Sequence, residues 1–225
     1  MRKALLFLVS ISILVSCGRT GTPAPVLRNA VDSVSYCVGM DLGDYIVRTN
    51  QKMDIGDELD LDILMKGIQA SMAEDNTINS DTRYELMRRF FNEILPEMNA
   101  RCSEDFLQRA QKAKKNAVVS PSGLIYEIIN PGNDRKPDQS STVWFKYEGR
   151  RMDGSLYETT YDTDDIVSKP VEVMIPGIRE GLSHIGEGGI IKLWISPSLA
   201  YGKEGNDYIG PNQALYYYIE LVETR

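Results

Sequence analysis

The stretch LYYYIEL, residues 215–221, decides the fold of the C-terminal half of this 225-residue chain. Its side chains alternate at a period of two, which is typical of an antiparallel strand that buries one face. The same alternation recurs in LIYEII (124–129), VWFKYEG (143–149) and IIKLWI (190–195). Turn sequences such as Asp153-Gly154 separate the stretches. Residues 118–225 are therefore predicted to form an antiparallel sheet.

One short helix is predicted among these strands. It begins near Pro176, and Ile178, Leu182 and Ile185 fall on one of its faces. One helix packed on one face of an antiparallel sheet makes an α+β domain. The predicted fold class is therefore α+β, with a helical N-terminal region and a C-terminal sheet wrapped on one short helix.

The N-terminal half, residues 30–117, has the helical period instead. Apolar residues recur three and four positions apart, and Asp60 and Ser80 are predicted to cap two of the helices. The segment 81–117 would form a rod of roughly 50 Å, kinked or broken at Pro96. Because a long helix with an apolar stripe needs a partner, this half is predicted to dimerise, and a compact local bundle is the alternative.

The first residues are predicted to form an export signal. Arg2 and Lys3 precede an apolar run that is too short for a membrane-spanning helix. The sequence LVSC (14–17) resembles the lipobox of bacterial lipoproteins, with Cys17 as the lipidated residue; an ordinary signal peptide with an incidental cysteine is the alternative. The predicted boundaries are a signal peptide at 1–16, a tether at 17–29, the helical region at 30–117 and the sheet domain at 118–225.

Export would place the protein where disulfides are permitted. Besides Cys17, the chain has Cys37 and Cys102, both on helical apolar stripes. They could pair, or each could be a buried free thiol.

The composition excludes several kinds of chemistry. The only histidine is His184, predicted to be a solvated surface residue, so catalytic triads must use it and a zinc site with several histidines cannot be built in one chain. The formal charge of −7 argues against a nucleic-acid partner. No metal and no cofactor is expected.

The C-terminal strands and turns resemble the FKBP-type peptidyl-prolyl isomerases. The stretches that carry the resemblance keep the family's order and spacing over about eighty residues. They are VWFKYEG (143–149), Asp153-Gly154, Ile175-Pro176-Gly177, Glu180-Gly181-Leu182, Gly188, Leu199-Ala200-Tyr201-Gly202, Gly205, Pro211-Asn212 and LYYYIEL (215–221).

The resemblance extends upstream, through DSVSYCVG (32–39), LDILMKGIQA (61–70) and SGLIY (122–126). These stretches are similar to exported two-part members of the macrophage-infectivity-potentiator type. The resemblance implies a homodimer through residues 30–117 whose long helices carry the isomerase domains. It also implies X–Pro segments of folding polypeptides as partners. With the lipidation site, it places the protein in the bacterial cell envelope, anchored to the outer membrane and facing the periplasm.

The resemblance also assigns a site. Its catalytic residues would be Tyr201, Tyr147 and Glu158, with the Tyr201 hydroxyl donating to a substrate carbonyl. Substrate would further contact a pocket wall, a floor at Ile178 and a flap at Ile209; the wall residues are Tyr157, Val171, Ile175 and Tyr217. Rotation about an X–Pro bond breaks no covalent bond, so it needs no nucleophile, metal or histidine.

The sequence departs from the family pattern at this site. The floor is usually tryptophan and here is Ile178, and the usual Phe-Asp pair is Tyr157-Glu158. The segment around residues 173–175 is also shorter than in many relatives. The predicted function is a peptidyl-prolyl cis-trans isomerase with weakened turnover that assists the folding of exported proteins. The alternative is a chaperone or prolyl-peptide-binding lipoprotein with little or no catalysis.

Overall fold

The structure is a computed structural model that describes residues 25–53, 59–74, 78–113 and 116–225. Cys17 and the predicted signal peptide lie outside the described residues. The chain divides after Asp41 into two units. The helices of its N-terminal half are α1 (Ala30–Met53), α2 (Leu61–Met72), α3 (Ser80–Arg89), the π-helix η1 (Phe90–Ile94) and α4 (Leu95–Ala113). Within the described ranges, no helix is long and apolar enough to span a membrane.

The helix starts follow from side-chain caps. Asp60 caps α2 as predicted, and its carboxylate accepts from the amides of Asp62 and Ile63. The prediction for α3 is wrong by one residue. The cap is Asn79, whose side chain accepts from the Thr82 amide, and Ser80 is the first helical residue.

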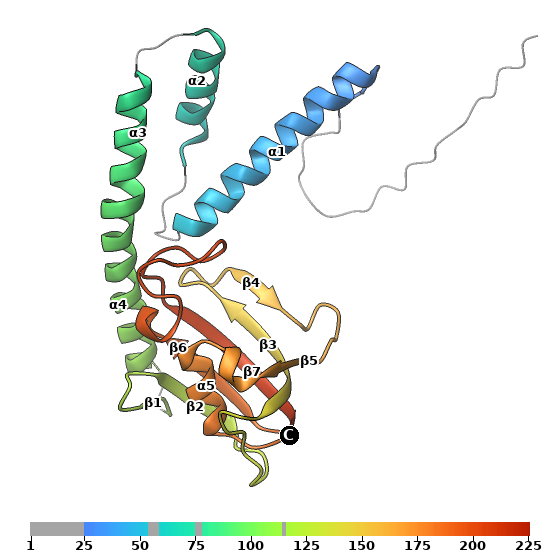
Figure 1. The fold of residues 1–225 in the computed structure, drawn as a ribbon, viewed down its shortest axis with the longest axis vertical. Helices are drawn as coiled ribbons and strands as arrows, with labels where there is room; N and C mark the ends of the chain where they lie inside the picture. The colour runs from blue at the N-terminus through green and yellow to red at the C-terminus, as the bar shows by residue number, and fades with distance from the viewer. Residues whose placement is uncertain (1–24, 54–58, 75–77, 114–115) are drawn as a thin grey trace, which may run out of the picture. The chain divides into compact units, whose positions relative to one another are not determined.

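Pro96 does not break the long helix. A π-turn, η1, joins α3 to α4, and the Leu95 amide donates to the Phe90 carbonyl five residues before it. Pro96 has no N–H and its ring crowds the preceding turn, and the wider π-turn absorbs this locally. The helical path therefore continues from α3 through α4 (Figure 1).

The C-terminal half forms one antiparallel sheet in the order β1-β2-β6-β7-β3-β4, with β5 paired to β3 (Figure 1). Its strands are β1 (Val118–Val119), β2 (Ile125–Asn130), β3 (Thr142–Arg150), β4 (Leu156–Thr159), β5 (Val167–Pro170), β6 (Ile190–Ile195) and β7 (Leu215–Thr224). Two 3₁₀ turns, η2 (Val171–Val173) and η3 (Pro197–Leu199), lie in the connections. The predicted α+β class is confirmed.

The short helix α5 (Pro176–Ser183) packs on one face of the sheet. Ile178, Leu182 and Ile185 are all buried, as the sequence pattern predicts. They join the alternate side chains of β6 and β7 in the main hydrophobic core.

Part of the opposite face of the sheet, at β2 and β6, is covered by α4. Trp194 and Ile125 pack there with Ala110 of the helix, so both faces of β6 are buried near Trp194. The period-two pattern predicts a half-exposed strand at this point. The prediction for His184 also needs correction, because its ring is half-buried and stacks on Tyr126 at a centroid distance of 4.3 Å. Cys37 is an exposed free thiol and Cys102 a partly buried one.

Candidate functional site

A cavity of 260 Å³ opens between α5 and the sheet. It gathers six of the residues that the sequence predicts for the site: Tyr147, Glu158, Ile175, Ile178, Tyr201 and Tyr217. They come from β3, β4, α5 with the residue before it, the turn after η3, and β7. Residues that are distant in sequence therefore share one apolar, aromatic hollow.

The floor of the cavity depends on a close approach of α5 to β6. Pro176 is the first residue of the helix, where its missing N–H costs nothing. A Cβ on Gly181 would lie 2.6 Å from a methyl carbon of Leu193, and one on Gly177 would lie 2.5 Å from Ile195. These glycines let the helix lie directly on the strand, which brings Ile178 to the cavity with 8% of its surface exposed.

One carboxylate holds the tyrosine hydroxyls of the wall together. Glu158 accepts from the Tyr147 hydroxyl at 3.1 Å and from the Tyr217 hydroxyl at 2.5 Å. The Tyr157 hydroxyl donates in turn to that of Tyr217. The network fixes the aromatic rings, because each hydroxyl must stay near its partner to remain satisfied.

Gly149 makes room for this network. It pairs with Glu158 across β3 and β4 and with Tyr217 across β3 and β7. A Cβ at this position would lie 2.9 Å from Cγ of Glu158 and 3.0 Å from the Tyr157 ring. A glycine near the C-terminal end of β3 is therefore required for the tyrosines and the glutamate to converge.

The site keeps its tyrosines protonated. Burial, followed by the nearby Glu158 carboxylate, raises the pKa of Tyr147 and of Tyr201. The pKa of Tyr217 is raised by its burial and then by its contact with Tyr157. The Tyr147 and Tyr217 hydroxyls use their protons on Glu158. The protonated Tyr201 hydroxyl can donate to a bound peptide, whereas a tyrosinate could only accept.

Comparison with known proteins matches both halves of the chain. Residues 133–222 match the family described as FKBP-type peptidyl-prolyl cis-trans isomerase, and residues 31–128 match the domain amino terminal to it. The outer membrane protein MIP of Legionella longbeachae is 30% identical over 236 residues, which cover 100% of this chain and 99% of that protein. The chain belongs to the FKBP-type peptidyl-prolyl cis-trans isomerases.

A further relative and a solved structure agree with this FKBP-type assignment. The FKBP-type isomerase FkpA of Escherichia coli K12 is 29% identical over 88% of this chain and 77% of its own length. The crystal structure of FkpA from Escherichia coli has a TM-score of 0.52 at 28% identity and covers 89% of this chain and 99% of that one. The protein is thus an isomerase of X–Pro bonds that assists protein folding.

Three residues that the FKBP resemblance places at the pocket do not line the cavity. Tyr157 lies behind Tyr217, edge-on to its ring. Val171 turns into the core at the start of η2. Ile209 is only 1% exposed, because Asn206 accepts from the amides at 208 and 209 and turns this side chain inward. The exposed side chain at this point of the loop is Tyr208.

Five residues line the FKBP-type cavity without having been predicted: Phe145, Lys169, Val173, Met174 and Ile219. Alternation could have found Phe145 and Ile219, since they lie two residues from Tyr147 and Tyr217 on the same strand faces. Val173 and Met174 occupy the shortened segment, which carries no periodic signal. Nothing in the sequence marks Lys169.

The cavity offers an apolar, aromatic surface and tyrosine hydroxyls, which are the groups that rotation about an X–Pro bond would use. In the planar amide the carbonyl oxygen carries partial negative charge, and this charge falls as the bond twists. An apolar hollow therefore disfavours the planar state more than the twisted one. In the described part of the chain, no group of three or more acidic, cysteine or histidine side chains is placed to hold a metal.

Proposed function

We propose that the 260 Å³ cavity is the prolyl site, with Tyr201, Tyr147 and Glu158 as its catalytic residues. The observation that carries the proposal is the convergence of aromatic rings, a fixed carboxylate and the Ile175–Ile178 floor on one hollow. In this proposal the proline ring of the substrate enters between the tyrosine rings of the cavity wall. The protonated Tyr201 hydroxyl then donates to a substrate carbonyl and holds the peptide turned.

Tyr201→Phe tests the site. It removes one donor and leaves the ring, so kcat/KM for a short X–Pro peptide is expected to fall several-fold, in line with a lost hydrogen bond of about 1 kcal/mol. Tyr208→Phe, at an exposed loop position, is the matched control and should leave the rate unchanged. Equal rates for the Tyr201→Phe variant and the parent chain would contradict the assignment.

We also propose that turnover is weakened by the aliphatic floor. Isoleucine offers less flat surface than an indole beneath a proline ring, a loss of about 1 kcal/mol in aromatic contact. Ile178→Trp is therefore expected to raise the rate of proline-limited refolding several-fold. The assay compares the variant and the parent chain on one model protein at equal concentration. A rate that does not rise rules out the floor as the cause.

The second candidate function is a chaperone or prolyl-peptide-binding lipoprotein with little turnover. It is favoured by the apolar side chains that the helices leave uncovered. Exposed examples are Val34, Val38, Leu42, Tyr45, Leu61, Ile63, Met65 and Tyr84. Tyr201→Phe separates the two functions. A chaperone activity that binds unfolded chains on the helices does not use Tyr201, so this variant should keep it. Suppression of aggregation that falls together with the isomerase rate would count against this second function.

The same uncovered faces support a homodimer through residues 30–117. Single apolar residues on a surface are ordinary, whereas apolar faces on α1, α2 and α3 together indicate a covering partner. Sedimentation equilibrium of the chain from residue 18 onward should give twice the mass of one chain. A monomeric mass at micromolar concentration contradicts the dimer.

We further propose a bacterial cell-envelope location, with a lipid on Cys17 that holds the protein at the outer membrane, facing the periplasm. The support is the lipobox-like sequence 14–17 and the likeness to the outer membrane protein MIP. Mass spectrometry of the membrane-extracted protein should find a diacylglyceryl addition on Cys17. An unmodified chain cut at another residue contradicts the anchor.

A further inference from the structure

The loop Gly202–Ala214 is held from outside the isomerase domain by helix α4. The Asn99 side-chain amide donates to the Pro211 carbonyl at 2.8 Å. The Ser103 hydroxyl donates to the Asn212 carbonyl at 2.7 Å and accepts from the Ala214 amide at 2.8 Å. Two side chains of α4 thus satisfy three main-chain groups at the end of the loop.

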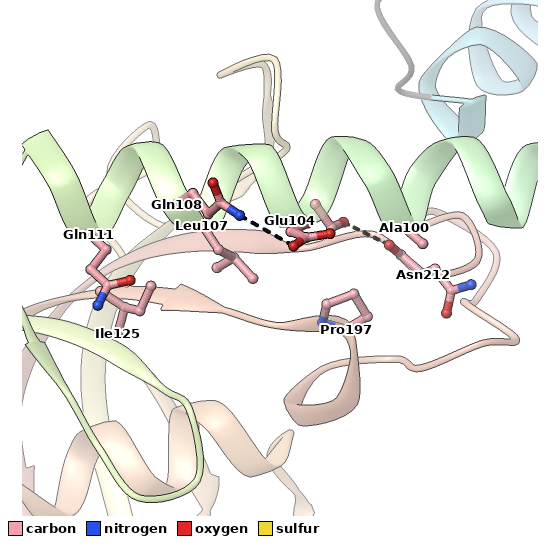
Figure 2. Close-up of a pocket in the computed structure, with 9 residues that line it drawn as sticks. Ala100, Glu104, Leu107, Gln108, Gln111, Ile125, Pro197 and Asn212 are labelled. Atoms are coloured by element: carbon pink, nitrogen blue, oxygen red, sulfur yellow. Dashed lines mark hydrogen bonds between the residues drawn. The ribbon is translucent and has the colours of Figure 1, made fainter.

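These two polar side chains are buried, unlike their neighbours on the helix. Asn99 is 0% exposed and Ser103 is 2% exposed. Beside them a groove of 390 Å³ follows α4, and Figure 2 shows Asn212 beneath the helix at one end of it. Buried polar groups are costly unless they are hydrogen-bonded, so Asn99 and Ser103 are suited to this position only while the loop stays in place.

The end of α1 holds the same loop from another direction. The Gln213 side chain donates to the Lys52 carbonyl at 2.8 Å and accepts from the Gly210 amide at 2.9 Å. The approach is so close that a Cβ on Gly210 would lie 2.1 Å from the Lys52 oxygen. Two helices of the N-terminal half therefore fix one loop of the C-terminal half.

This loop connects two residues of the cavity wall. It begins directly after Tyr201 and ends directly before β7, which carries Tyr217. The Asn212 amide donates to the Gly202 carbonyl at 2.8 Å and ties the two ends of the loop together. Ile209, in the middle of the loop, packs in the core cluster that contains Tyr217. A displacement of the loop therefore displaces the wall.

We propose that Asn99 and Ser103 are positioning residues for prolyl isomerisation. They act through the loop, which they hold in the position that places Tyr201 at the cavity. The inference rests on the proposed role of this cavity as the prolyl site. It assigns to the connecting helix a part in forming the site, in addition to carrying the domain.

The test uses the chain from residue 18 onward with Ser103→Ala and Asn99→Leu. Leucine has nearly the shape of asparagine and suits a buried position, so the Asn99→Leu variant is expected to fold. It provides a second test if Ser103→Ala is unstable. Gln108→Ala is the matched control, because among the described residues its side chain bonds only to Glu104 of the same helix. Circular dichroism confirms that each variant is folded at 10 °C, where the kinetics are measured.

We expect kcat/KM for a short X–Pro peptide to fall about tenfold in both variants, mainly through KM, since small displacements of binding groups have effects of this size. Ser103→Thr keeps the hydroxyl and should restore most of the rate. Hydrogen exchange at the Ala214 amide should accelerate in Ser103→Ala and not in Gln108→Ala.

Variants that melt earlier but keep the parent kcat/KM at 10 °C would overturn the inference, because Asn99 and Ser103 would then serve stability alone. A folded Ser103→Thr variant as slow as Ser103→Ala would overturn the role of the hydroxyl. Failure of the proposed site is recognised separately, because Tyr201→Phe then has no effect. Failure of the inference leaves Tyr201→Phe effective and Ser103→Ala without effect.

Discussion

Replacing Glu158 with leucine is expected to lower kcat/KM for a short X–Pro peptide about tenfold or more. The carboxylate accepts from the hydroxyls of Tyr147 and Tyr217, and leucine accepts nothing. Each buried hydroxyl left without a partner costs about 1–3 kcal/mol, and the rings relieve this cost by moving. Because about 1.4 kcal/mol of barrier is a factor of ten in rate, a modest loss of wall geometry is sufficient.

Two controls separate this effect from a general loss of fold. Glu158→Gln keeps the shape and one acceptor oxygen, so its rate should lie between those of the parent and the leucine variant. Glu223→Leu removes a carboxylate of β7 that pairs with Arg225 at the surface, and it should leave the rate unchanged. Peptide kinetics below the melting transition provide the measurement. A Glu158→Leu variant with the parent rate would disprove the network's role.

The second large effect is a loss of stability in alkali. Burial, followed by the neighbouring Glu158, raises the pKa of Tyr157, and burial raises that of Tyr217 well above its ordinary value of about 10. Below pH 10 both tyrosines are neutral in the folded and the unfolded chain, so their contribution is fully present. Above pH 10 only the unfolded chain releases these protons. Each tyrosine then lowers the free energy of unfolding by about 1.4 kcal/mol per pH unit.

Two such residues acting from pH 10 to pH 12 remove about 5 kcal/mol, the size of the whole stability of many domains. Urea unfolding followed from pH 8 to pH 12 should therefore show a flat region and then a steep fall. The double variant Tyr157→Phe/Tyr217→Phe should fall less steeply, and Tyr84→Phe, at an exposed position, should match the parent chain. Parallel curves for the parent chain and the double variant would contradict the prediction.

The parts of the fold that depend on periodicity could be predicted from the sequence. Leu215, Tyr217 and Ile219 alternate along β7, and Ile178 and Leu182 recur at helical spacing in α5, so their burial follows from local geometry. The second covered face could not be predicted in this way. Trp194 occupies an outward position of β6 and is buried only because α4 lies over it.

The candidate site was predictable to the same extent. Tyr147 and Tyr217 reach the cavity because strand alternation fixes their direction, and Ile178 because helix periodicity does. Ile209 and Val171 turn away, since their direction depends on an asparagine-capped turn and on the 3₁₀ turn η2. Loop conformation of this kind is set by individual hydrogen bonds, which have no period. The loop carbonyls that accept from Asn99 and Ser103 are more than one hundred residues away.

The π-turn before Pro96 changes the direction in which the side chains of α4 point relative to those of α3. A π-turn adds one residue to the helical ladder, and one residue turns a helix by about 100°. The rotational phase of α4 relative to α3 is therefore offset by more than a quarter turn from that of an unbroken helix. This phase is what directs Asn99, Ser103 and Ala110 onto the isomerase domain while Tyr84 and Met87 face solvent. A single extra residue thus sets the rotation between the face that α3 exposes and the face that α4 packs on the catalytic domain.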